Sequence, residues 1–119
     1  MKTFSTSELC AMQGEATHKT AQRLNAAEIA RLQPQVASWQ VSDIDGILQL
    51  QRRFPMANFV AAMGFATLIT EIAEANDHHP KLVLEYDSVT VSWWSHSIAG
   101  LHLNDFAAAA KTDKAFANL

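Results

Sequence analysis

The spacing of apolar residues changes along this 119-residue chain, and the changes limit which folds it can adopt. Leu48, Leu50 and Phe54 recur at period two, which is typical of a strand with one buried face. After Pro55, apolar side chains recur at three- and four-residue spacing, which predicts a helix. Beyond Pro80 the period returns to two. The chain is therefore expected to contain strands as well as helices.

Capping signals indicate where the predicted helices lie. Asn25, followed three residues later by Glu28, resembles an N-cap with its reciprocal acid, and this helix is expected to end near Pro34. The helix after the first pair of strands is expected to end near Asn76. The alanine-rich segment 104–116 has high helix propensity and closes the chain.

The predicted strands form two hairpins. The first joins strands 39–41 and 47–54 through turn residues 43–46, and the second joins 82–86 and 89–93 through Asp87 and Ser88. Each hairpin has one apolar face, so the economical packing is one four-stranded antiparallel sheet with the helices packed on one face. The predicted fold is α+β, in the order helix-strand-strand-helix-strand-strand-helix.

The last predicted strand alternates Val and Trp with Ser and Thr, so the uncovered face of the sheet is expected to be partly apolar. Such a face favours self-association or a ligand pocket. We therefore expect an oligomer.

Charge and cysteine content disfavour several classes of function. Nine Lys and Arg residues stand against twelve Asp and Glu residues, and the only adjacent basic pair is Arg52 and Arg53. This pattern offers no basic groove for a phosphate backbone, so nucleic-acid binding of that kind is disfavoured. The single cysteine, Cys10, cannot form an internal disulfide or a cysteine-based zinc site, which favours a cytoplasmic location.

The N-terminal segment 1–23 is polar and lacks clear periodicity, so it is interpreted as an arm, in part ordered, that precedes one domain at 24–119. The first 20 residues lack the apolar core of a signal peptide. The longest apolar stretch, 59–69, is far shorter than the roughly 20 residues that a membrane span needs. No membrane anchor is predicted.

Three histidines are expected to meet at one edge of the sheet. His78 and His79 follow the central helix, beside the acids Glu74 and Asp77, and precede the second hairpin. His96 is expected to end the last strand. A hairpin returns the chain to the edge at which it began, so His96 is expected near His78 and His79.

Spacing alone leaves three interpretations of this cluster open. His78 and His79 can stabilise the helix C-terminus through its dipole. A metal site needs three ligands aimed at one ion, but adjacent histidines diverge in an extended segment, and the i, i+4 spacing of zinc-binding helices is absent. The third interpretation is acid–base catalysis, because imidazole titrates near neutral pH and Asp77 and Glu74 can orient it.

Several motifs at fixed spacing together resemble one enzyme family. They are Glu74-x-x-x-His78-His79-Pro80, Tyr86-Asp-Ser-Val89, Ser95-His96-x-x-x-Gly100-Leu101 and Asp105-Phe106, with Glu28-Ile29, Trp39 and Arg53-x-x-x-x-Asn58-Phe59 upstream. The set is similar to the pterin-4a-carbinolamine dehydratase family. That family dehydrates a 4a-hydroxytetrahydropterin, formed when aromatic amino acid hydroxylases use their pterin, to the quinonoid dihydropterin.

The resemblance implies a hydro-lyase that acts on a pterin without a cofactor or a metal and assembles as a homodimer or homotetramer. It implies that His78 and His96 act on opposite faces of the pterin ring, while His79 binds substrate and assists as a base. The implied substrate-binding residues are Glu74, Asp77, Asp105, Trp39, Trp94 and Ser95, with Trp39 equally well interpreted as a core residue.

An alternative function is a non-catalytic pterin-binding or protein-interaction module. Animal relatives also serve as a dimerisation cofactor for a homeodomain transcription factor. A pure scaffold has no need for three histidines, so their presence together favours catalysis.

The chain departs from the family pattern in the arm and before the third histidine. Bacterial members often carry Cys-x-x-Cys in the arm, whereas this chain has Cys10 and Gln13, which excludes a thiol-pair role. Small hydroxyl residues commonly precede the third histidine, whereas this chain has Trp93, Trp94 and Ser95. Trp94 is expected to reshape the pocket.

A third departure lies before the last helix, where His102 replaces the usual capping Thr. Because His is a weaker cap, Asn104 is expected to start the helix, which leaves the position of Asp105 open. His102 is either a fourth imidazole near the site or a solvated loop residue, and His18 in the arm has no expected role.

Overall fold

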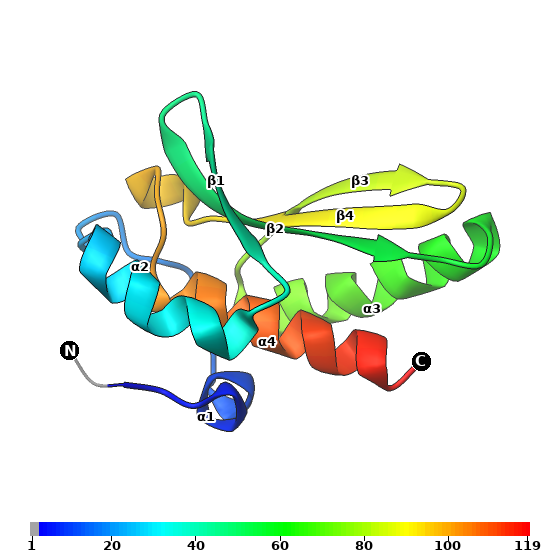
Figure 1. The fold of residues 1–119 in the computed structure, drawn as a ribbon, viewed down its shortest axis with the longest axis horizontal. Helices are drawn as coiled ribbons and strands as arrows, with labels where there is room; N and C mark the ends of the chain where they lie inside the picture. The colour runs from blue at the N-terminus through cyan, green and yellow to red at the C-terminus, as the bar shows by residue number, and fades with distance from the viewer. Residues whose placement is uncertain (1–2) are drawn as a thin grey trace.

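The computed structural model describes residues 3–119 as one sheet layer backed by helices (Figure 1). The elements follow in the order α1 (Thr6–Ala11), α2 (Ala26–Leu32), the 3-10 helix η1 (Gln33–Val36), β1 (Gln40–Ile44), β2 (Ile47–Pro55), α3 (Phe59–Asn76), β3 (Lys81–Glu85), β4 (Ser88–Trp93), the 3-10 helix η2 (His96–Ile98) and α4 (Leu103–Ala117). Within the described residues, no helix combines the length and the apolar character that crossing a membrane requires.

The strands form one antiparallel sheet in the order β1-β2-β4-β3. Leu50 of β2 pairs with Trp93 of β4, and Lys81 of β3 pairs with Ser92 of β4. The helices α2, α3 and α4 all lie on the same side of this sheet (Figure 1). The predicted α+β fold, with helices packed on one face of an antiparallel sheet, is confirmed.

Capping residues determine where the helices begin. Glu28 N–H donates to the Asn25 side chain, and Asn25 N–H donates to the Glu28 side chain, as the sequence predicts. The predicted start of the last helix is wrong, because α4 begins at Leu103 with His102 as its N-cap. The Nδ1 atom of His102 accepts a hydrogen bond from Asn104 N–H at 3.2 Å. An imidazole nitrogen here takes the place of a hydroxyl oxygen.

Each hairpin turns over two residues. Asp45 and Gly46 both have positive φ angles, 54° and 82°, as in the tight turns whose twist matches the flanking strands. Because this turn takes only two residues, β1 extends beyond the predicted end at Val41. The second turn is Tyr86–Asp87 rather than the predicted Asp87–Ser88, because Ser88 already belongs to β4 and pairs with Glu85 of β3.

Aromatic side chains fill the space between the sheet and the helices. Phe54 of β2 lies among Trp39, Phe65 and Phe116, with ring centroids at 5.8, 5.0 and 4.9 Å. The rings meet edge-on or tilted, an arrangement that adds to the stabilisation from burial. The Arg52 guanidinium covers the Phe54 ring at 4.3 Å from its centroid.

The uncovered face of the sheet differs from the prediction. Val89, Val91 and Trp93 of β4 are fully buried in the core, and Trp93 Nε1 donates to Thr112 Oγ1 of α4 at 3.1 Å. Successive side chains of a strand point to opposite faces. The residues of β4 that face away from the helices are therefore Ser88, Thr90 and Ser92. The expected partly apolar open face is wrong for this strand.

The N-terminal arm contains α1, which packs against α4 (Figure 1). Leu9 of α1 is fully buried in the core. Lys111 of α4 donates from Nζ to the carbonyl oxygen of Cys10 at 2.7 Å and to that of Met12. Burial lowers the pKa of the Lys111 ammonium group below its usual value. One buried leucine and one cation thus help to attach α1 to the body of the domain.

Replacing Lys111 by Met keeps most of the aliphatic stem and removes both hydrogen bonds to the arm. We expect the free energy of unfolding to fall by about 1.5–3 kcal/mol, the contribution of hydrogen bonds that involve a charged group. Urea denaturation followed by circular dichroism measures this change. Lys114→Met is the control, because Lys114 is exposed on the same helix. Equal stability of the two variants would show that Lys111 does not attach the arm.

Candidate active site

The end of α3 determines how the first two histidines point. Asp77 closes the helix in the left-handed conformation, with φ 45° and ψ 47°, and His78 N–H donates back to Ala73 O at 3.1 Å. This is the hydrogen-bond pattern of a Schellman cap, here without the usual glycine. The chain then runs extended, so His78 is buried and His79 is exposed. The backbone caps the helix, and both imidazoles remain available for other contacts.

His78 is held by a buried carboxylate. Its Nε2 atom lies 2.5 Å from Asp105 Oδ1, and the two side chains are 6% and 0% exposed. Its ring stacks on Trp93 with centroids 5.6 Å apart. Asp105 Oδ2 also accepts from Ser95 Oγ at 2.8 Å and from His102 N–H at 3.0 Å. Because these donors converge on one carboxyl group, we assign it as ionised and place the His78 proton on Nε2, which leaves Nδ1 for proton exchange.

His79 is oriented by Glu74 from the last turn of α3. Its Nε2 atom lies 2.5 Å from Glu74 Oε2, and the two side chains are 56% and 69% exposed. Exposed ion pairs contribute little to stability, so the pair matters for where it holds the ring. It fixes the direction of an imidazole that stands at the surface.

His96 arrives from the other end of the β3–β4 hairpin. It begins η2 rather than ending the last strand as predicted, because β4 stops at Trp93. Its Nε2 atom lies 3.2 Å from His79 O, and its ring packs on Trp94 with centroids 4.3 Å apart. A carbonyl oxygen only accepts hydrogen bonds, so Nε2 of His96 carries the proton and Nδ1 again remains for exchange.

The three histidines line one cleft of about 420 Å³, a volume within the range of small-ligand sites. The lining residues are Ala16, Thr17, Asp77, His78, His79, His96 and Ser97. Between residues 3 and 119, no group of three His, Cys, Asp or Glu side chains is arranged to hold a metal ion. Three imidazoles line this cleft, and imidazole can both donate and accept protons.

Comparison with known families matches residues 22–115 to the family described as pterin 4 alpha carbinolamine dehydratase. The chain belongs to this family. A protein of Gloeobacter violaceus, provisionally named pterin-4-alpha-carbinolamine dehydratase 1, is 50% identical over 98 residues, which are 82% of this chain and 84% of that protein. A Nitrosococcus oceani protein, provisionally named pterin-4-alpha-carbinolamine dehydratase, is 46% identical over 107 residues, which are 90% and 95% of the two chains.

The family likeness extends to a solved structure. A crystal structure from Brucella melitensis, described as a transcriptional coactivator/pterin dehydratase, matches with a TM-score of 0.71 and 30% sequence identity. The match covers 79% of this chain and 98% of that one. The pterin dehydratase family therefore accounts for the resemblance seen in the sequence and for the fold.

One residue implied by that resemblance lies away from the cleft. Trp39 is 1% exposed in the core, and its Nε1 atom donates to Asp113 Oδ1 at 2.8 Å. Burial raises the pKa of the Asp113 carboxyl, while hydrogen bonds from Trp39 and Arg52 act in the opposite direction. The polar atom of Trp39 is thus engaged with α4 and not with the site.

Most of the other implied substrate-binding residues contact a histidine instead of lining the cleft. Asp105 contacts His78, Ser95 contacts Asp105, Glu74 contacts His79, Trp94 packs on His96, and Asp77 alone of this set lines the cleft. His102 is neither a fourth imidazole of the cleft nor a solvated loop residue, since it is half-buried as the cap of α4. Asp105, Glu74 and Trp94 thus contact an imidazole directly, and Ser95 contacts one through Asp105.

The sequence gives no signal for the part of the cleft that the arm supplies. Ala16 and Thr17 line it from the arm, and Ser97 lines it from η2. Thr17 Oγ1 lies 2.8 Å from Ser95 Oγ, a residue 78 positions away. Contacts between residues so far apart in the chain leave no periodicity and no local motif in the sequence.

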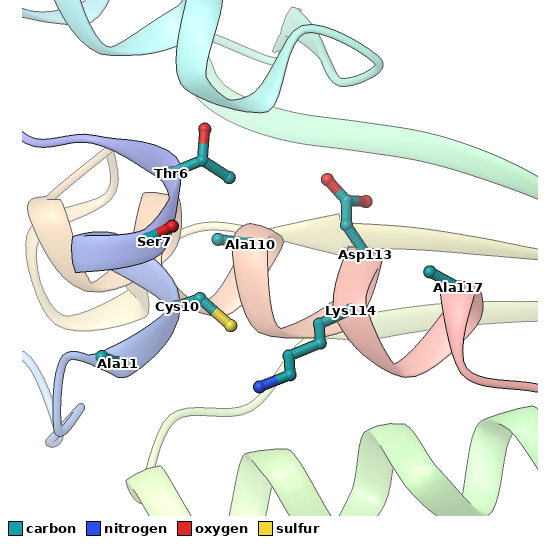
Figure 2. A pocket seen from close by; sticks show the side chains of 8 residues that line it. All are labelled: Thr6, Ser7, Cys10, Ala11, Ala110, Asp113, Lys114 and Ala117. Carbon is teal, nitrogen blue, oxygen red and sulfur yellow. The ribbon is translucent and has the colours of Figure 1, made fainter.

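A second cavity lies away from the histidines, between α1 and α4 (Figure 2). It encloses about 480 Å³ and is lined by Thr6, Ser7, Cys10, Ala11, Ala110, Asp113, Lys114 and Ala117. None of the three family histidines reaches it. The three imidazoles therefore gather in the smaller cleft.

Proposed function

We propose that this chain catalyses the dehydration of a 4a-hydroxytetrahydropterin to the quinonoid dihydropterin. The observation that carries the proposal is a cleft lined by three imidazoles, each with Nε2 beside an oxygen of the protein. Membership of the dehydratase family and the names of the Gloeobacter and Nitrosococcus relatives support the same reaction.

The reaction consists of two proton transfers without a redox step. The C4a–O bond breaks with its electron pair on oxygen, and a general acid protonates this oxygen so that it leaves as water. N5 gives its proton to a base, and its electron pair forms the C4a=N5 double bond. Imidazole suits both steps because it can donate and accept protons near neutral pH.

His78 and His96 are the proposed general acids, one for each face of the flat pterin ring. Each acts as an imidazolium that gives its Nδ1 proton to the leaving oxygen while Nε2–H stays on Asp105 Oδ1 or His79 O. Asp105 holds the His78 ring at 2.5 Å, so the direction of proton transfer from this imidazole is fixed. His79, held by Glu74, binds the substrate and assists as the base at N5. Asp77 lines the cleft and is proposed to accept hydrogen bonds from the amino and ring N–H groups of the pterin.

The proposal is tested by adding the purified chain to a freshly generated 4a-hydroxytetrahydropterin. Stopped-flow absorbance follows the appearance of the quinonoid dihydropterin against the spontaneous reaction. We expect a saturable acceleration. A chain that binds the pterin but leaves the spontaneous rate unchanged would instead be a non-catalytic pterin-binding or protein-interaction module.

Removal of metal ions is expected to leave turnover unchanged, because proton transfer between imidazole and the pterin needs no ion. The dehydration rate is measured before and after dialysis against a chelator, and again after addition of zinc. A rate that falls on chelation and returns with zinc would contradict metal-free catalysis.

We also propose that the chain acts as a homodimer or homotetramer. Phe59, Val60 and Met63 of α3 are 49%, 81% and 49% exposed, and apolar groups exposed together favour association. These residues replace the open sheet face as the expected basis for assembly. Light scattering at micromolar concentration is expected to give twice or four times the monomer mass. A monomer mass alone would contradict the oligomer.

A further inference from the structure

The N-terminal arm forms one wall of the cleft, although it precedes the matched family region. Ala16 and Thr17 line the cleft, whereas the family match begins at residue 22. Gly14 N–H donates to Asn76 Oδ1 at 2.8 Å, and a Cβ atom at Gly14 would lie only 2.6 Å from that oxygen. The arm backbone therefore lies directly on the end of α3, where a larger residue does not fit.

A second group of hydrogen bonds attaches the arm at Thr17. Ser97 Oγ donates to Thr17 O at 2.6 Å, and Asn104 Nδ2 donates to Thr17 Oγ1 at 3.1 Å. The Thr17 hydroxyl also lies 2.8 Å from Ser95 Oγ. Thr17 is half-buried, so its hydroxyl is held between two protein groups and not simply solvated.

The direction of these hydrogen bonds follows from counting protons. Ser95 Oγ donates its single proton to Asp105 Oδ2, so it accepts the proton of Thr17. Thr17 in turn accepts from the amide of Asn104. Donation therefore runs from Asn104 through Thr17 and Ser95 to Asp105, whose other oxygen bonds His78. Buried hydrogen bonds linked in this way polarise one another.

We propose that Thr17 is a positioning residue for His78. It acts through Ser95 on Asp105 and keeps Oδ1 of this carboxylate facing Nε2 of the imidazole. His78 is thereby held with its proton on Nε2 and with Nδ1 available for exchange with the ligand. The effect on turnover rests on the proposed function, whereas the effect on the ring proton does not.

Thr17→Val removes the hydroxyl and keeps the shape of the side chain. We expect kcat to fall about tenfold, the effect of one hydrogen bond of ordinary strength, with KM little changed because the wall of the cleft remains. Thr17→Ser restores the hydroxyl and is expected to recover most of the parent kcat. Thr20→Val is the matched control, because this exposed hydroxyl contacts the ring of His18, and it is expected to keep the parent kcat.

Nitrogen-15 NMR of the histidine rings gives a readout that does not depend on turnover. At a pH where the His78 ring is neutral, the parent is expected to show one tautomer, with its proton on Nε2, and Thr17→Val is expected to show a mixture of both. Asn104→Ala removes the donor to Thr17 and leaves the arm sequence intact, so it is expected to change the His78 spectrum in the same way. Limited proteolysis checks that the arm stays attached in each variant.

Two results would overturn the positioning role. One is a folded Thr17→Val variant with the parent kcat and a single Nε2–H tautomer at His78. The other is an equal loss of kcat in Thr17→Val and Thr17→Ser, which would show that the hydroxyl is not the group that matters. If the parent does not dehydrate the pterin but Thr17→Val still changes the tautomer, the proposed function fails while the positioning role stands.

Discussion

Asp105→Asn is expected to lower both stability and turnover more than any other single conservative substitution in the site. The Asp105 side chain is fully buried, and both of its carboxylate oxygens accept hydrogen bonds. An amide of the same shape carries no charge and replaces one acceptor by a donor. A buried hydrogen-bonding group left without its partner costs about 1–3 kcal/mol, so we expect a loss near the upper end of that range in urea denaturation.

The same substitution is expected to lower kcat by about 10²–10⁴-fold, the contribution of a general acid or base. The reason is that His78 loses the charged acceptor that holds its Nε2 proton and the direction of its ring, and three donors compete for the one oxygen of the amide. Turnover is measured on the folded fraction, under conditions in which denaturation curves show the variant to be native.

Asp87→Asn is the matched control for this change. Asp87 lies 3.5 Å from Arg53, and the two side chains are 43% and 54% exposed. Exposed pairs of this kind contribute about 0–1 kcal/mol, so the control is expected to keep the parent stability and rate. Equal behaviour of Asp105→Asn and Asp87→Asn would show that the buried pair does not hold the site together.

The predicted fold holds because its signals are local. The capping pair Asn25 and Glu28 and the change of period at Pro55 each depend on residues a few positions apart. Alternation in β4 shows that the two faces of the strand differ, but it does not tell which face the helices cover. The misassigned open face comes from this ambiguity, since Val91 and Trp93 are the residues that the helices cover.

The candidate site was predictable only where the chain is locally constrained. A hairpin brings its two ends together, so the approach of His96 to His79 follows from the sequence and is found. The divergence of His78 and His79 follows from the extended backbone after α3. Contacts made between distant segments, such as that of Thr17 with Ser95, depend on how the arm packs and cannot be inferred from neighbouring residues.

His78→Ala and His96→Ala are expected to slow the turnover of opposite 4a-hydroxy stereoisomers. A proton donor must lie within hydrogen-bond reach of the leaving oxygen, and one imidazole cannot reach both faces of a flat ring. Each variant is therefore expected to lose about 10²–10⁴-fold on one stereoisomer and much less on the other. The double variant is expected to show this loss of rate on both stereoisomers.

Two further variants distinguish an effect on folding from an effect on catalysis. His78 is buried and stacks on Trp93, so Ala also opens a cavity, whereas His78→Gln keeps a group that can bond Asp105 and cannot act as an acid. His18→Ala is the matched control, because this exposed imidazole bonds Thr20 in the arm, and it is expected to keep the parent rate on both stereoisomers. If His78 and His79 only stabilised the helix end, their loss would cost up to about 2 kcal/mol without slowing the folded fraction.

The most direct test is the single-turnover dehydration of each 4a-hydroxy stereoisomer by the parent chain, by His78→Ala, by His96→Ala and by the double variant. Circular dichroism confirms the folding of each variant before the rates are compared. We predict that the two single variants show opposite stereoisomer preferences and that the double variant approaches the spontaneous rate on both. Folded variants that dehydrate both stereoisomers at the parent rate would contradict the assignment of these histidines as the catalysts.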